Sequence, residues 1–382
     1  MEQTKLSVFC DKVMEAGWLL AAVMAPLFFD VYSSRVFEPD KITLVRSLAV
    51  FMCAAWLIKL LDSGLGMRTR GADSQADSAG DRWYVRLAKR NALAWPTLFL
   101  VLAYLISTLF SVSQVVSLWG SYQRLQGTYS TFSYIIIFAL LCGSMRRREQ
   151  VERLITIMLF TSLPASLYGL VQHNKLEFLP WAGDVTTRVT SSMGNAIFIA
   201  AWLVMVVPLS LARFVDAAMQ LWTDQVMPTQ GEGTSLSGQA WAALAAMQGV
   251  ALYVLMYQLL RFYAAGQKTG EVVGSLDAGL VVLALGAIIL PFFLGIRGRL
   301  TPVLGAAAYL FLLMVQLTAI WFSGSRGPLL GLMAGLFVFT IMFTVLRRLR
   351  RTFYAAIGLA LAGALFLGLF NLPNTPLEPL KQ

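Results

Sequence analysis

The sequence predicts an all-α protein, a polytopic transmembrane helix bundle of about eleven helices. The chain has 382 residues, of which 58% are hydrophobic and only 13% are charged, and its mean hydropathy is +0.68. That composition is too apolar for a water-soluble protein. The apolar runs are continuous rather than alternating, and membrane strands require alternation. Both observations favour membrane-spanning helices.

The helices are expected wherever an apolar run approaches the roughly 20 residues needed to cross a bilayer. The first run follows Lys5 and Lys12 as in a signal peptide, but it is long and lacks a small-residue cleavage site. It is therefore predicted to be the first helix. In chain order the runs are residues 13–33, 42–61, 93–111, 129–145, 154–172, 195–213, 239–260, 276–295, 301–322, 328–346 and 353–371.

Two polar stretches interrupt this pattern, residues 63–81 and 223–239. Both are rich in small and charged residues and could not bury a core, so mobile linkers are expected there. We find no convincing internal repeat and no large soluble domain. Residues 1–382 are predicted to form a single transmembrane domain.

The basic residues predict the orientation of the chain in a bacterial inner membrane. Most of the 30 Lys and Arg fall on one side if the N-terminus is cytoplasmic, as the positive-inside rule requires. An odd number of helices then places the C-terminus in the periplasm. The net charge of +10 lies in loops beside membrane ends, so topology explains it without nucleic acid as a partner.

The sequence offers no recognisable metal or cofactor site. Cys10, Cys53 and Cys142 are isolated, and no close pair of acidic residues stands beside them. The only histidine, His173, is expected to be solvated at a helix end rather than catalytic. Any chemistry is therefore expected to need neither a metal nor a cofactor.

Three arginines on the predicted periplasmic side indicate an anion-binding site. Arg124, Arg188 and Arg326 each lie in a loop rich in Gly, Ser or Thr, just before a helix. A helix N-terminus offers free backbone N–H groups, and a guanidinium offers a planar fork that matches phosphate oxygens. With Ser325 as a further donor, the three could bind one diphosphate.

An ordinary structural role is the alternative for these arginines. Arginines near helix ends commonly extend to the membrane interface. Aromatic residues in the same loops would form a normal interfacial belt, namely Trp119, Tyr122, Trp181 and Trp321.

Four segments together resemble the bacterial O-antigen ligase and O-antigen polymerase-related membrane proteins. Two of them are WGSYQRLQGTYSTFSY (119–134) and RVTSSMGNAIFIAAWLVMVVPL (188–209). The others are FSGSRGPLLGLMAGL (322–336), which resembles the Ser-Arg-Gly helix start of the family, and FEPDKITLVR (37–46), which resembles its first outer loop. All four occur in the order of that family.

The resemblance implies a membrane glycosyltransferase of polysaccharide or lipopolysaccharide biosynthesis. Such enzymes take a glycan from a polyprenyl diphosphate carrier on the periplasmic face and transfer it to lipid A core, another glycan or a protein. By position, Arg124, Arg188 and Arg326 would hold the carrier diphosphate. Positive groups that match the charge developing on a diphosphate leaving group lower the barrier without a metal.

The chain departs from the family near its C-terminus. The ligases carry a large periplasmic segment with a histidine, whereas this chain stops at NLPNTPLEPLKQ (371–382). We therefore expect truncation before that segment, or activation of the acceptor by Glu177 or Asp184.

Transport is the competing class of function. A lipid-linked glycan flippase or another multi-pass transporter would share the composition. Ion-coupled transporters place ionisable groups at mid-membrane, and the predicted spans contain almost none.

Overall fold

The computed structural model describes residues 4–32, 37–67, 93–177, 179, 184–223, 237–269, 278–293 and 300–371. Within these residues the chain is all-α, with twelve α-helices, one short 3-10 helix and no strand. They belong to two compact units. Unit 1 comprises Met1–Ala165 and Ser192–Gly194, and unit 2 comprises Ser166–Ser191 and Asn195–Gln382. A single transmembrane domain stays a prediction.

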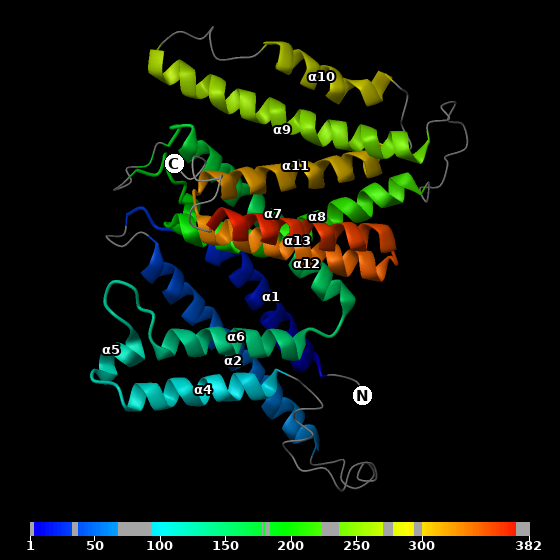
Figure 1. The fold of residues 1–382 in the computed structure, drawn as a ribbon. Coiled ribbons are helices and arrows are strands. Elements are labelled where there is room, and N and C mark those ends of the chain that lie inside the picture. The colour runs from blue at the N-terminus through cyan, green and yellow to red at the C-terminus, as the bar shows by residue number, and fades with distance from the viewer. Residues whose placement is uncertain are drawn as a thin grey trace. The chain divides into compact units, whose positions relative to one another are not determined.

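Unit 1 is built around α2, which packs against α1 and α6 (Figure 1). Its helices are α1 (Lys5–Leu27), α2 (Glu38–Met67), α4 (Ala94–Leu109), α5 (Gln114–Trp119), α6 (Thr128–Ser144) and the first part of α7 (Arg148–His173). Trp18 of α1 and Met52 of α2 are fully buried in its core, and Leu140 of α6 packs with them. These contacts hold the three helices together.

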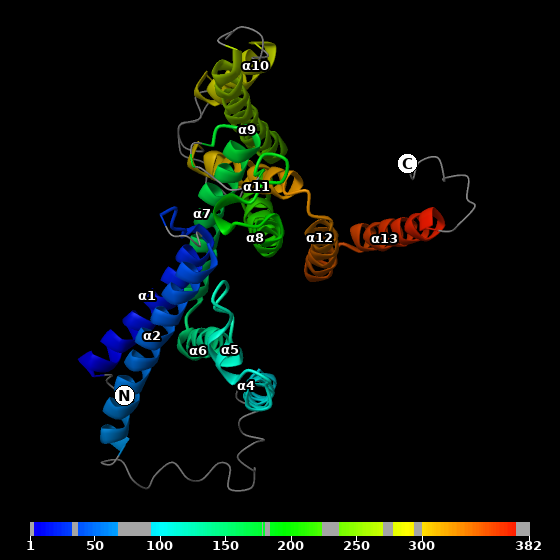
Figure 2. The ribbon, with the colours of Figure 1, turned by 90° about the vertical axis from the view of Figure 1, so that its left-hand side faces the viewer.

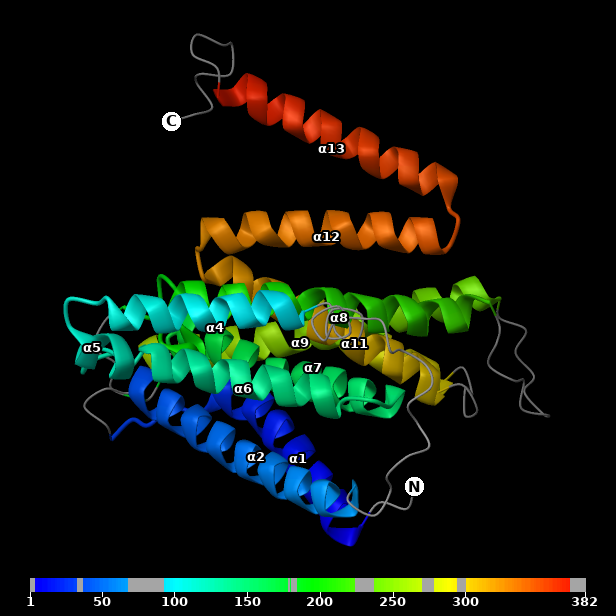
Figure 3. The same ribbon diagram turned by 90° about the horizontal axis from the view of Figure 1, so that it is seen from below.

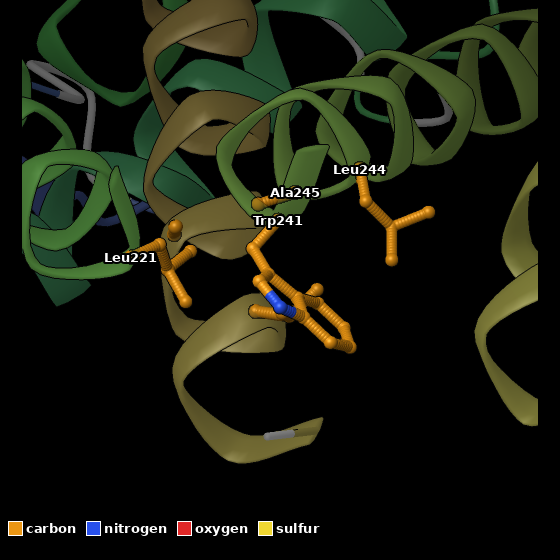
Figure 4. Packing of buried hydrophobic residues seen from close by; sticks show 6 residues of the cluster. Leu221, Trp241, Leu244 and Ala245 are labelled. Atoms are coloured by element: carbon orange, nitrogen blue, oxygen red, sulfur yellow. The ribbon is translucent and has the colours of Figure 1, made fainter. Parts of the chain in front are cut away.

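Unit 2 is built around α11, which packs against α8 and α9 (Figure 3). Its helices are the end of α7, α8 (Ala196–Trp222), α9 (Gly238–Thr269), α10 (Ala278–Phe293), α11 (Leu300–Phe322), α12 (Arg326–Leu346) and α13 (Arg350–Asn371). The buried Trp241 indole lies between Leu221 and Leu244 (Figure 4). A Cβ at Gly249 would lie only 2.8 Å from the Ala307 carbonyl oxygen, so small residues let α9 approach α11. A short turn joins α12 to α13 (Figure 2).

Each of the predicted apolar runs coincides with a helix, but the boundaries of α1 differ. The helix begins at Lys5 because the Thr4 hydroxyl caps it, accepting a hydrogen bond from the Ser7 amide at 3.0 Å. It ends at Leu27, where Phe28 adopts extended backbone. The six-residue helix α5 has no counterpart among the predicted runs.

Six described helices are long and apolar enough to cross a membrane. They are Glu38–Asp62, Arg148–His173, Ala196–Trp222, Gly238–Ala264, Thr301–Phe322 and Arg326–Leu346, and Ala94–Leu109, Thr128–Ser144 and Gly279–Leu290 are apolar but shorter. Helix α1 is not among the six, because its first half contains Asp11, Lys12 and Glu15. Helix length and composition therefore indicate a membrane protein, while about eleven crossings, the inner membrane and the orientation stay predictions.

The two predicted linkers are shorter than expected at their ends. Helix α2 continues to Met67, so the first linker loses its first five residues to the helix. Helix α9 begins at Gly238, so the second linker loses its last two. Residues 68–81, 224–236 and 372–382 lie outside the described residues.

Candidate functional site

In unit 2, the segment before α8 meets the turn between α11 and α12. The Val189 amide donates to the Phe322 carbonyl oxygen at 3.1 Å. The Nε of Arg188 donates to the Ser323 carbonyl oxygen at 3.3 Å, and its Nη2 donates to the Ser325 hydroxyl at 3.4 Å. The structure therefore brings together two of the predicted diphosphate ligands, Arg188 and Ser325.

The turn that receives Arg188 has a defined geometry. Gly324 has a φ of +60°, a conformation that favours glycine, and Ser323 and Ser325 on either side are buried. Ser325 is the N-cap of α12, yet its hydroxyl caps no amide of the helix. Because Pro328 has no N–H, the uncapped donors of the first turn are the amides of Arg326 and Gly327. The exposed Arg326 side chain adds a full positive charge at this helix N-terminus.

His173 lies at the end of α7 and contacts both segments of this site. Its ring stacks on Phe322 with a centroid distance of 3.6 Å and an interplanar angle of 13°. Its Nδ1 lies 3.2 Å from the Thr186 carbonyl oxygen. A carbonyl oxygen can only accept a hydrogen bond, so this contact assigns the proton of the neutral ring to Nδ1. Nε2 then carries no proton, and its lone pair can accept one.

The sequence prediction of a solvated histidine therefore misses these contacts. The ring is half-buried, and its stacking partner lies at the end of a different helix, where sequence spacing gives no information. The only available signal was the position of His173, at the end of a predicted helix beside the loop that carries Arg188.

Gln172, next to His173, is fully buried and orders the backbone that follows Arg188. Its Oε1 accepts hydrogen bonds from the amides of Thr190 at 3.3 Å and Ser191 at 2.7 Å. Its Nε2 donates to Glu177 Oε2 at 3.3 Å. Glu177, one candidate for activating the acceptor, is thus engaged with the side chain that shapes the site.

Asp184, the other candidate, organises its own loop. Its carboxylate accepts hydrogen bonds from the hydroxyls and amides of Thr186 and Thr187, including the Thr186 hydroxyl at 2.6 Å. The hydrogen bonds from Thr186 and then Thr187 hold the pKa of the exposed Asp184 carboxyl well below its ordinary value. A carboxylate stabilised in this way is a weak base.

In unit 1, Arg124 lies at the tip of a loop closed by two glycines. A Cβ at Gly120, where φ is +88°, would lie 2.4 Å from the Gln126 amide nitrogen. A Cβ at Gly127 would lie 2.4 Å from the Leu118 carbonyl oxygen. The arginine itself is 70% exposed, and its Nε lies 3.8 Å from Glu38 Oε2. The glycines of this motif therefore set the loop that presents Arg124.

Arg46 of α2 holds the same loop from beneath. Its Nη2 donates to the carbonyl oxygens of Trp119 at 2.9 Å and Leu125 at 2.7 Å, and its Nε donates to the Ser130 hydroxyl at 3.1 Å. Its guanidinium carbon also lies 4.6 Å from the centre of the Tyr129 ring. Sequence reasoning noted the segment FEPDKITLVR but missed this positioning role of Arg46.

The four predicted diphosphate ligands divide between the units. Arg124 belongs to unit 1, whereas Arg188, Ser325 and Arg326 belong to unit 2. A common site for all three arginines stays a prediction. Comparisons of the chain with protein-family models, with curated proteins and with solved structures found no match.

Proposed function

We propose that the chain is a membrane glycosyltransferase of the O-antigen ligase or polymerase type, which takes a glycan from a polyprenyl diphosphate carrier. The observation that carries the proposal is the contact of Arg188 with the Ser323–Ser325 turn, directly before Arg326 at the start of α12. It supports part of the sequence-based prediction that Arg124, Arg188 and Arg326 bind one anion, because it brings the loops of Arg188 and Arg326 together.

The chemistry of the turn suits a diphosphate. Arg188 uses two of its five N–H donors on the turn, which fixes the guanidinium and leaves donors for a phosphate. Arg326 supplies a second guanidinium, and the first-turn amides of α12 point along the positive end of the helix dipole. Fixed hydrogen-bond donors of this kind stabilise the leaving diphosphate more than they stabilise the intact lipid-linked glycan, because negative charge on the diphosphate grows as the glycosidic bond breaks.

His173 is the group that we assign to the acceptor hydroxyl. The acceptor oxygen attacks the anomeric carbon, the carbon–oxygen bond to the diphosphate breaks, and the hydroxyl proton passes to Nε2 of His173. The Nδ1 contact with Thr186 and the stacking on Phe322 hold the ring in one orientation. Asp184 suits this role less, because its carboxylate is already stabilised by Thr186 and Thr187.

A lipid-linked glycan flippase or another transporter is the second candidate function. Among the side chains that the structure describes, the buried polar ones are Ser, Thr and Gln, and none is Asp, Glu, Lys or Arg. Proton- and ion-coupled transporters usually place such groups within the membrane. The observation favours the transferase over a coupled transporter.

Transfer by the purified chain in liposomes tests the proposal, with a polyprenyl diphosphate-linked glycan as donor and lipid A core as acceptor. Replacing Arg188 or Arg326 by Ala should cost about 2–4 kcal/mol of transition-state stabilisation. Replacement by Lys, which keeps the charge but loses the fork, should cost less. Arg350→Ala, an exposed arginine at the start of α13, is the matched control and should transfer normally.

Binding of polyprenyl diphosphate alone separates the carrier site from the choice of acceptor. Arg188→Ala should weaken this binding even if lipid A core is not the acceptor. Unchanged binding in both Arg188→Ala and Arg326→Ala would refute the site, and translocation of the lipid-linked glycan without transfer would favour the flippase.

His173→Gln tests the acceptor step separately. The variant should lower kcat about 10²–10⁴-fold while leaving polyprenyl diphosphate binding intact, since general base catalysis contributes on that order. A normal kcat would leave His173 a purely structural role.

A further inference from the structure

A cavity of about 450 Å³ opens in unit 1, away from Arg46 and Arg124 along the helices. It lies where α1 and α7 begin and α2 and α6 end, and residues from all four helices line it. Its volume falls within the range of small-molecule sites. Nothing in the proposed transferase chemistry uses this cavity.

Both acidic side chains that line the cavity form ion pairs. Lys59 of α2 pairs with Asp11 of α1, and Arg153 of α7 pairs with Glu15 of α1 at 2.8 Å. Gln150 Nε2 also donates to Glu15 Oε2 at 2.9 Å. Neither carboxylate is therefore available to neutralise another cation.

Three further basic side chains line the cavity, namely Lys12, Arg146 and Arg147. All three are exposed, and no ion pair with a described residue engages them. The backbone of Arg146 and Arg147 is nevertheless fixed, because the buried Gln150 accepts hydrogen bonds from the amides of Arg146 at 2.8 Å and Arg147 at 3.1 Å. The cavity thus presents an excess of positive charge on an ordered wall.

Exposed apolar side chains also line the cavity. Val8, Trp56 and Leu60 line it and are 36%, 41% and 51% exposed. Two of the helices that form it, α2 and α7, are long and apolar enough to cross a membrane. A ligand that fills this cavity should therefore combine an anionic group with apolar groups.

We propose that this cavity binds the headgroup of an anionic phospholipid. Arg146, Arg147 and Lys12 contact the phosphate diester, since guanidinium groups match phosphate oxygens in charge and geometry. The acyl chains lie along Val8, Trp56 and Leu60. Basic pockets between membrane helices recognise lipid headgroups by the same combination of charge and apolar contact.

Thermal unfolding in a neutral detergent tests the proposal. Short-chain phosphatidylglycerol, added at physiological salt, should raise Tm by several degrees and saturate, because a ligand that binds only the folded state stabilises it. Phosphatidylcholine of the same chain length should leave Tm nearly unchanged. Glycerol 3-phosphate, which has the phosphate without the chains, should shift Tm much less at equal concentration.

The double variant Arg146→Gln/Arg147→Gln should lose the response to phosphatidylglycerol. Arg350→Gln/Arg351→Gln, an exposed arginine pair at the start of α13, is the matched control and should keep it. Lys12→Gln, a milder change on a different helix, should also weaken the response to phosphatidylglycerol. This single variant provides the test if the double variant does not fold.

Three results would overturn the proposal. An absence of any shift with phosphatidylglycerol would remove the site. An equal loss of the shift in the control pair would show attraction by net charge alone. An equal shift with glycerol 3-phosphate would identify a soluble phosphate compound, not a lipid, as the ligand. All three are binding results, so they do not depend on glycan transfer.

Discussion

Nη2 of Arg46 lies 2.7 Å from the carbonyl oxygen of Leu125, 79 residues later in the chain. The same nitrogen reaches the Trp119 carbonyl oxygen at 2.9 Å. A single side chain of α2 therefore ties both arms of the loop that presents Arg124. Arg46 therefore positions the loop, whereas Arg124 is exposed on it. The two arginines should respond differently to substitution.

Arg46→Met should destabilise unit 1 on the order of 2–4 kcal/mol, because it leaves several acceptors without their charged donor. Arg124→Met is the matched comparison in the same loop. It should cost only about 0–1 kcal/mol of folding free energy, as expected for an exposed ion pair. Denaturant unfolding in detergent gives both free energies, and equal losses would contradict the assigned roles.

Gly120→Ala should destabilise the loop by roughly 2 kcal/mol or more, because the new Cβ would meet the Gln126 backbone at a positive φ. The same substitution at Gly335 of α12 would meet nothing within 4 Å. Gly335→Ala should therefore be neutral or stabilising by about 0.5–1 kcal/mol. The two unfolding free energies decide the matter, and a neutral Gly120→Ala would mean that the loop is not closed as described.

Arg188 and Ser325 should be energetically coupled in glycan transfer. Arg188→Ala, Ser325→Ala and the double variant form a cycle, and kcat/KM should give a coupling energy of about 0.5–1.5 kcal/mol. Thr340→Ala in α12, whose hydroxyl donates to the Leu336 carbonyl oxygen of the same helix, provides the control cycle with Arg188. That control should be additive, and additivity in both cycles would show that the Arg188–Ser325 contact contributes nothing to transfer.

Asp184 should stabilise its loop only while it is ionised. Its folded-state pKa is lowered, so the stabilisation is present above the ordinary value of 3.8 and is lost as the pH falls below it. Hydrogen exchange at the amides of Thr186 and Thr187, corrected for intrinsic rates, should show protection at pH 6 that disappears at strongly acid pH. Asp184→Asn should lower the protection at pH 6 and reduce its pH dependence, and a variant as protected as the native chain would refute this role.

The sequence by itself determined the helical character of the chain. The apolar runs predicted every long helix that the structure describes, because a continuous apolar segment in a membrane must satisfy its backbone internally as a helix. The sequence predicted the ends of helices less well where a local cap sets them. The Thr4 cap starts α1 at Lys5, before the predicted run. The acidic and basic residues in the first half of α1 keep this helix out of the group that is apolar enough to cross a membrane.

The sequence also singled out Arg188, Ser325 and Arg326 through their glycine- and serine-rich loops. Only the tertiary structure decided that Arg188 reaches the Ser323–Ser325 turn, that His173 stacks on Phe322, and that Arg46 holds the loop of Arg124. The partners in each contact belong to segments far apart in the chain, and several of them lie in loops or turns. A composition or a spacing along one helix fixes which residues share a face, but contacts between helices depend on how their side chains pack, and that is set by the whole fold.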